Sequence, residues 1–116
     1  MRPVYHCLVL HAHLPYVRHP EHPRCDEERW LFEALTETYL PLLQLLERGA
    51  ARGWRHCLTL SLSPTLLSML ADPLLQQRYR DHLGRLRTLA ARECLRTRRD
   101  PAQQALARHY RQRLAA

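Results

Sequence analysis

The 116-residue sequence has no lysine, no closely spaced pair of cysteines and no long hydrophobic run. No apolar stretch approaches the ~20 residues of a membrane span, and prolines and histidines interrupt the apolar stretch near the N-terminus. We therefore expect neither a membrane partner nor a secretory signal. Because no cysteines form a Cys-x-x-Cys pair, a zinc knuckle and a thioredoxin-type motif are excluded. We expect reduced thiols in a cytoplasmic protein, with Cys7 and Cys57 as small core residues.

All 18 basic residues are arginines, and with 11 acidic residues they give a net charge of +7. The charge is uneven, since residues 1–72 carry 7 Arg and 8 acidic residues, whereas residues 73–116 carry 11 Arg and 3 acidic residues. A segment as basic as residues 73–116 can bind phosphates. A nucleic-acid-binding helical module is therefore an alternative function for this chain. Only two tyrosines and no known binding motif accompany the arginines, so we expect a solvated outer helix face and no nucleic-acid partner.

The hydrophobic pattern predicts two strands separated by a helical segment. Residues 4–10 (VYHCLVL) and 57–62 (CLTLSL) are short, β-prone and apolar on both faces, which is typical of buried strands in a parallel sheet. Between them, Asp26-Glu27-Glu28 opens a helix, and Pro41 predicts a kink or break in it. Gly49 and Gly53 supply stop signals. The apolar stripe of this helix consists of Leu31, Leu35, Tyr39, Leu42 and Leu46.

Two or three further helices follow the second predicted strand. A short helix is expected over residues 66–70, and the pairs Asp72-Pro73 and Asp100-Pro101 each predict a helix start, with aspartate as the N-cap. The apolar face of the first long helix consists of Leu75, Tyr79, Leu83, Leu86, Ala90 and Cys94, and the opposite side carries Arg78, Arg85, Arg92 and Arg99. The order β-α-β-α-α predicts the α/β class with a right-handed crossover. Two parallel strands rarely form a stable sheet alone, so we expect the opening part of a larger α/β domain.

The clearest chemical signal lies in residues 11–33, HAHLPYVRHPEHPRCDEERWLFE. His11 and His13 end the first predicted strand two positions apart, so they share a face. This is the carboxyl end of the strand, where parallel α/β enzymes place their sites. We expect the two imidazoles to converge on a ligand, the alternative being a pair of core histidines. Three prolines in the following loop, at 15, 20 and 23, exclude a regular element there.

Three stretches carry a resemblance to a known family: LVLHAHLPYVRHP at 8–20, ERWLFEALTETYLPLL at 28–43 and TLSLSPTLLSMLAD at 59–72. In content and order they resemble glycoside hydrolase family 57, in particular its α-1,4-glucan branching enzymes. The resemblance implies an incomplete (β/α)7 barrel similar to a TIM barrel. Residues 1–72 would then be its first two β/α units, and residues 73–116, where the similarity is weak, a basic helical segment that is an insertion or a set of outer helices.

The resemblance also implies a retaining transglycosylase that cleaves an α-1,4 linkage in amylose or a glycogen-like glucan and transfers the donor to a 6-hydroxyl. Such chemistry uses two carboxyl groups about 5–5.5 Å apart, one of them the nucleophile. In the family, a glutamate and an aspartate from later strands supply them, and nothing after residue 73 matches either motif. We therefore expect no catalytic residue and no cofactor in this chain.

The same resemblance assigns substrate-binding roles to three residues. His11 and His13 would hydrogen-bond sugar hydroxyls at the cleavage subsite, since a neutral imidazole both donates and accepts. Trp30 would pack on a pyranose ring near the donor sugar, the alternative being a core tryptophan. Glu33 is a supporting candidate that would orient a histidine, or else a helix-surface carboxylate.

Two loop residues, Tyr16 and Arg18, are further supporting candidates. Tyr16 would line the cleft or cover the barrel mouth. Arg18 would pair with a loop carboxylate, although a solvated arginine is favoured. His19 and His22 would extend the histidine pair into a metal cluster, but we expect a solvated loop.

A metal-dependent hydrolase that uses the His-x-His pair is the remaining alternative. Zinc sites of this kind need a third protein ligand besides a water molecule. Asp26 is the nearest carboxylate after the proline loop, and no later histidine-rich motif completes a site. We therefore expect no metal ion bound to this chain.

Overall fold

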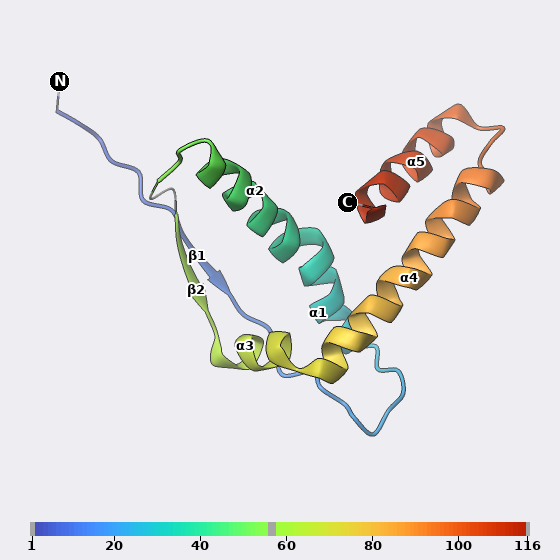
Figure 1. Ribbon diagram of the computed structural model, residues 1–116, viewed down its shortest axis with the longest axis horizontal. Coiled ribbons are helices and arrows are strands. Elements are labelled where there is room, and N and C mark those ends of the chain that lie inside the picture. The colour runs from blue at the N-terminus through green and yellow to red at the C-terminus, as the bar shows by residue number, and fades with distance from the viewer. Residues whose placement is uncertain (1, 56–57, 116) are drawn as a thin grey trace. The chain divides into compact units, whose positions relative to one another are not determined.

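The computed structural model describes residues 2–55 and 58–115, and the chain divides into two compact units, Met1–Leu75 and Gln76–Ala116 (Figure 1). Along the chain the elements are β1 (Val9–Ala12), α1 (Glu28–Ala34), the π-helical segment η1 (Leu35–Tyr39), α2 (Leu40–Ala51), β2 (Thr59–Leu62), α3 (Pro64–Ala71), α4 (Pro73–Arg96) and α5 (Pro101–Ala115). No helix in the described ranges is both long enough and apolar enough to cross a membrane.

The two strands pair in parallel, as the sequence predicts, with His11 opposite Ser61 and Ala12 opposite Leu62. Backbone hydrogen bonds extend the pairing at both ends, from Thr59 N to Leu8 O at 2.9 Å and from Ser63 N to Ala12 O at 3.1 Å. The first strand is shorter than expected, because residues 2–8 form no regular element.

The predicted burial of both strands is wrong for this chain. Ala12 is the one fully buried residue in the two strands, whereas Val9 is 62% exposed. The reason is that each strand has a single neighbour in the described sheet, which leaves its outer edge and part of its faces uncovered. The prediction of Cys7 as a core residue is also wrong, since this thiol is exposed in the segment 2–8, which forms no regular element. Cys57 lies outside the described residues.

The helical segment between the strands is interrupted as Pro41 predicts. Proline has no N–H to donate and its ring crowds the preceding turn, so a regular α-helix cannot run through it. Just before the proline the α-helix changes to the wider π-helical segment η1. There Leu40 N–H donates to Leu35 O, five residues back. The helix then resumes as α2 with Pro41 in its first turn.

The glycines close α2 as predicted. The helix ends at Ala51, and Gly53 adopts a positive φ of 84°, which is costly for other residues. Trp54 N–H then donates to Gly49 O at 2.9 Å, folding the chain back over the last turn. This brings the Trp54 ring so close to Gly49 that an added Cβ would lie 2.4 Å from Trp54 Cε3.

Side-chain caps start both helices after β2. Ser63 Oγ accepts from Leu66 N–H at 3.3 Å at the start of α3, and Asp72 Oδ1 accepts from Leu75 N–H at 3.0 Å at the start of α4. The Asp72 cap was predicted from the Asp-Pro pair and is confirmed. The core of this first unit consists of Ala12, Val17, Leu31, Phe32, Leu66, Met69 and Leu75.

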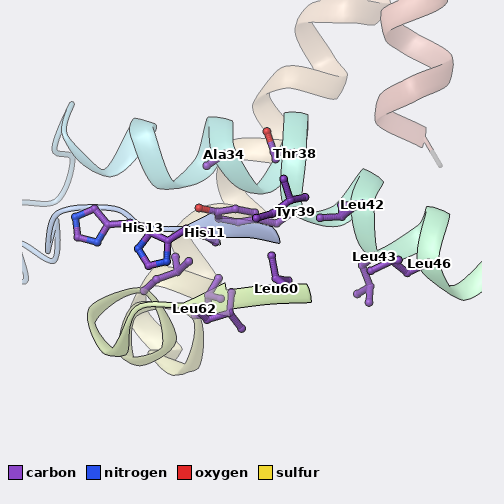
Figure 2. A pocket seen from close by; sticks show the side chains of 14 residues that line it. His11, His13, Ala34, Thr38, Tyr39, Leu42, Leu43, Leu46, Leu60 and Leu62 are labelled. Carbon is purple, nitrogen blue, oxygen red and sulfur yellow. The ribbon is translucent and has the colours of Figure 1, made fainter. Parts of the chain in front are cut away.

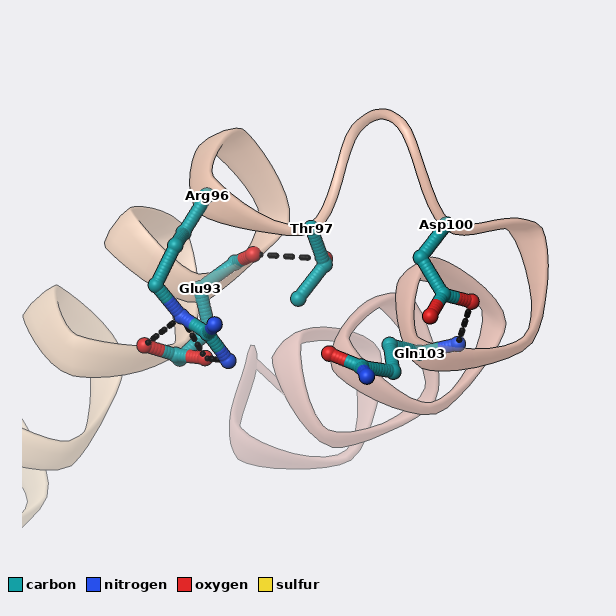
Figure 3. Close-up of polar contacts among 5 residues, drawn as sticks. All are labelled: Glu93, Arg96, Thr97, Asp100 and Gln103. Atoms are coloured by element: carbon teal, nitrogen blue, oxygen red, sulfur yellow. Dashed lines mark hydrogen bonds and ion pairs between the residues drawn. The ribbon is translucent and has the colours of Figure 1, made fainter.

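The second unit is a helical hairpin in which Arg87 Nε donates to Leu114 O at 2.6 Å, joining α4 to α5. Figure 3 shows its corner, where Arg96 binds the Glu93 carboxylate and Asp100 Oδ1 accepts from Gln103 N–H at 3.1 Å. The Asp100-Pro101 start is therefore confirmed. The predicted apolar face is also confirmed, because its six residues are buried or half-buried. On the opposite side Arg85, Arg92 and Arg99 are exposed, whereas Arg78 is half-buried.

Candidate functional site

The two histidines predicted to form a site lie together at the carboxyl end of β1. Their ring centroids are 6.0 Å apart and their planes are nearly parallel, at 12°. His11 is the third residue of the strand and His13 follows its end, so alternation places both on one face. Both side chains are exposed, which excludes the alternative of a core pair.

Ser61 is a hydrogen-bonding partner of one ring nitrogen of His11. Its Oγ lies 3.1 Å from His11 Nδ1, because the parallel register sets Ser61 directly opposite His11. Which atom donates depends on the tautomer of the imidazole. In either case the hydrogen bond occupies Nδ1 and leaves His11 Nε2 for a ligand.

A cavity of about 400 Å³ adjoins the pair within the first unit. Figure 2 shows the two imidazoles side by side and Tyr39 with several leucines farther along the cavity. Burial raises the pKa of the Tyr39 hydroxyl above its ordinary value. The lining residues come from β1, β2, α3 and the helical segment between the strands: Leu10, His11, Ala12, His13, Ala34, Thr38, Tyr39, Leu42, Leu43, Leu46, Leu60, Leu62, Leu66 and Leu70. An apolar cavity with a few polar groups is typical of small-molecule sites.

Trp30 and Glu33 lie on the surface of α1 and do not line this cavity. Trp30 is 54% exposed, so the alternative of a core tryptophan is wrong. Glu33 Oε1 lies 3.4 Å from Arg29 Nη2 in an exposed i,i+4 ion pair, as expected for a helix-surface carboxylate. Tyr16, in the loop after β1, is 57% exposed and also lies outside the cavity lining.

Arg18 is held by a carboxylate, so the favoured expectation of a solvated side chain is wrong. Its Nε lies 2.5 Å from Asp72 Oδ2, and the two side chains are only 32% and 17% exposed. The hydrogen bond from Leu75 N–H is the main cause that holds the pKa of Asp72 below its ordinary value, and Arg18 adds to it. Next to this pair, Val17 N–H donates to Met69 Sδ at 3.3 Å. The ion pair therefore anchors the loop that follows the histidines to the start of α4.

The sequence pattern does not assign Ser61 and Tyr39 to the site, although the structure brings both to it. Ser61 and Tyr39 were assigned only to the second strand and to an apolar stripe. Glu28 was expected only at a helix start, but it is 2% exposed in the first turn of α1. For Ser61 a signal was present, since alternation in TLSL puts the hydroxyl residues on one face, and parallel pairing turns that face toward the histidines.

The His-x-His pair gathers no third metal ligand in the described ranges. The one group there whose ligand atoms come close enough consists of His19, Cys25 and Glu27, in the loop before α1. The described residues therefore do not assemble around His11 and His13 the three-ligand set that a catalytic zinc site uses.

No protein-family model matches the sequence. The chain is 37% identical over 82 residues to a 1,4-alpha-glucan branching enzyme of Thermococcus kodakarensis, covering 70% of this chain and 12% of that protein. It is 39% identical over 66 residues to a probable 1,4-alpha-glucan branching enzyme of Mycobacterium tuberculosis, covering 57% of this chain and 12% of that protein. The chain thus spans about an eighth of the length of these curated relatives.

Among solved structures, an alpha-amylase of Thermotoga maritima, AmyC, superposes with a TM-score of 0.84. It is 42% identical in sequence, and the alignment covers 94% of this chain and 20% of that one. These comparisons confirm the resemblance to branching enzymes that the sequence motifs indicate. They also agree with the observed architecture, a parallel strand pair joined by helices within a fragment of an α/β fold.

Proposed function

We propose that this chain, a homologue of 1,4-alpha-glucan branching enzymes over part of their length, supplies substrate contacts in a branching enzyme of glycoside hydrolase family 57. The observation that supports this most is the exposed pair His11 and His13 at the carboxyl end of β1, beside a cavity rich in leucine. The reaction is cleavage of an α-1,4-glucan and transfer to a 6-hydroxyl, in cytoplasmic glycogen metabolism.

The hydrogen-bonding capacity of the imidazoles suits sugar hydroxyls. Ser61 holds His11 through Nδ1, so Nε2 of His11 is the atom that meets a hydroxyl near the reacting carbon. His13 stacks beside it and presents a second ring to the same sugar. A neutral imidazole donates through one nitrogen and accepts through the other. The two histidines can therefore bind a sugar hydroxyl that acts either as hydrogen-bond donor or as acceptor.

In this proposal β1 and β2 are the first two strands of an incomplete (β/α)7 barrel, and residues 1–72 form its first two β/α units. The segment 73–116 forms outer helices or an insertion. A retaining reaction needs a nucleophile and a general acid/base about 5–5.5 Å apart. We assign neither of these carboxyl groups to a residue of this chain.

Trp30 has the exposure that a sugar-binding aromatic residue needs. Its ring is 54% exposed at the start of α1 and is free to pack against the apolar face of a pyranose. Its place outside the cavity lining fits a contact with the donor sugar rather than with the sugar that the two histidines bind.

Removing either imidazole is expected to weaken the binding of maltoheptaose to the 116-residue chain by roughly three- to tenfold, because each variant loses one or two neutral hydrogen bonds. The variants are His11→Ala and His13→Ala, and His109→Ala in α5 is the matched control. Binding is measured by titration calorimetry. Unchanged affinity in both site variants, or an equal loss in His109→Ala, would contradict the assignment.

The chain by itself is expected to show no branching activity on amylose, since the resemblance places neither catalytic carboxyl group in it. After long incubation the iodine–amylose spectrum should stay unchanged, and linkage analysis should find no new α-1,6 bonds. New α-1,6 bonds would show that a carboxyl pair within these residues performs the reaction.

A further inference from the structure

The loop between β1 and α1 brings three different metal-ligand types together within nine residues. His19, Cys25 and Glu27 each offer one ligand atom, and all three atoms lie within 4.8 Å of one another. Cys25 Sγ donates to Glu27 Oε2 at 2.6 Å, so sulfur and oxygen are already in direct contact. The His22 ring lies beside the group, with its centroid 6.4 Å from that of His19.

This donor set is chemically selective. One imidazole nitrogen, one sulfur and one carboxylate oxygen suit a borderline ion such as zinc, whereas calcium and magnesium prefer oxygen alone. Ligand atoms around a tetrahedral zinc ion lie roughly 3.3–3.8 Å apart, as follows from the metal–ligand bond lengths. In the structure Cys25 Sγ and Glu27 Oε2 lie 2.6 Å apart and all three ligand atoms lie within 4.8 Å of one another, so ion binding requires side-chain rotations. The half-buried or exposed positions of these residues leave room for such rotations.

The loop that carries these ligands is restrained before any ion binds. Arg18, immediately before His19, is fixed by Asp72, and Glu27 directly precedes the buried Glu28 at the start of α1. Pro20 and Pro23 lie between the ligands and fix their own φ angles. A loop with both ends held loses less conformational entropy when it closes around an ion.

We propose that His19, Cys25 and Glu27 form a binding site for one zinc ion, with His22 or a water molecule as the fourth ligand. On binding, the Cys25 thiol releases its proton to solvent and the sulfur coordinates as thiolate, with no change of oxidation state. The ion closes residues 19–27 into a ring next to the segment that carries Tyr16 and Arg18. Its role is to brace this loop, and it is independent of the proposed action on glucans.

The test is a metal titration of the reduced, metal-free 116-residue chain. Cobalt(II) is expected to bind in one equivalent and give a near-ultraviolet sulfur-to-metal charge-transfer band, which zinc then removes by displacing cobalt. The Cys25→Ser variant should lose the band and bind zinc at least about tenfold more weakly, and His19→Ala should also bind more weakly. Cys7→Ser and Cys94→Ser are the matched controls and should behave like the unmodified chain.

A second measurement does not depend on cobalt. Zinc should protect Cys25 from alkylation, as mapped by mass spectrometry, while Cys7 and Cys94 react at unchanged rates. The proposal is overturned if Cys25→Ser retains the cobalt band and the zinc affinity, or if zinc protects Cys25 no more than Cys94.

Discussion

Replacing Leu66 with alanine is expected to lower the free energy of unfolding of the Met1–Leu75 unit by about 2–5 kcal/mol. Leu66 is 0% exposed in the first turn of α3, and its side chain also borders the cavity beside the strands. Truncation therefore enlarges an existing cavity that the surrounding side chains already fail to fill, which favours the upper half of this range. Urea denaturation followed by circular dichroism measures the loss.

Leu67→Ala is the matched control for this substitution. Leu67 is the next residue on the same helix, but it is 47% exposed, so its truncation should change the stability by no more than about 0.5 kcal/mol. Because the two variants lose the same atoms from adjacent positions, the difference between them measures burial alone. Equal losses would mean that the cluster around Leu66 and Met69 is not the core of this unit.

Local signals predicted most of the secondary structure. The Asp-Pro pairs mark the starts of α4 and α5 because each aspartate caps its own helix within three residues. The helix is interrupted at Pro41 because proline has no backbone N–H to donate, and this cause is also local to the sequence. The parallel pairing of β1 and β2 was inferred from the helical segment between them, and the register confirms it.

Burial could not be predicted in the same way. An apolar strand pattern shows which faces are able to be buried, but coverage depends on neighbouring strands that a local pattern does not contain. Val9 illustrates this, because it belongs to an apolar stretch and yet is 62% exposed in a sheet of two described strands.

The candidate site likewise has one part that the local sequence predicts and another part that it does not. The adjacency of His11 and His13 follows from strand alternation alone, and the structure places their rings 6.0 Å apart. Their partners depend on contacts between distant segments: Ser61 is 50 residues from His11, and Asp72 is 54 residues from Arg18. The grouping of His19 with Cys25 depends on the path of an irregular loop, for which spacing gives no rule.

The Asp72→Ala substitution is expected to cost about 2 kcal/mol of unfolding free energy at pH 7. Two interactions end at this carboxylate, the N-cap hydrogen bond from Leu75 N–H at 3.0 Å and the ion pair with Arg18 at 2.5 Å. A lost cap costs about 1 kcal/mol. The partly exposed ion pair contributes up to ~1 kcal/mol, and its loss also frees the loop that follows the histidines.

The acid dependence of this contribution has a definite sign. The cap and Arg18 hold the pKa of Asp72 below its ordinary value, so the stabilisation is fully present above the pKa of the unfolded chain, about 3.9. It is lost as the pH falls through the lower pKa of the folded state. Asp72→Asn is the matched control, because asparagine still caps the helix but carries no charge. At pH 7, urea denaturation should place the stability of Asp72→Asn between those of the unmodified chain and of Asp72→Ala. The difference between aspartate and asparagine should shrink as the pH falls below about 3.9. A difference that does not shrink at all as the pH is lowered would mean that the charge of Asp72 is not what anchors Arg18.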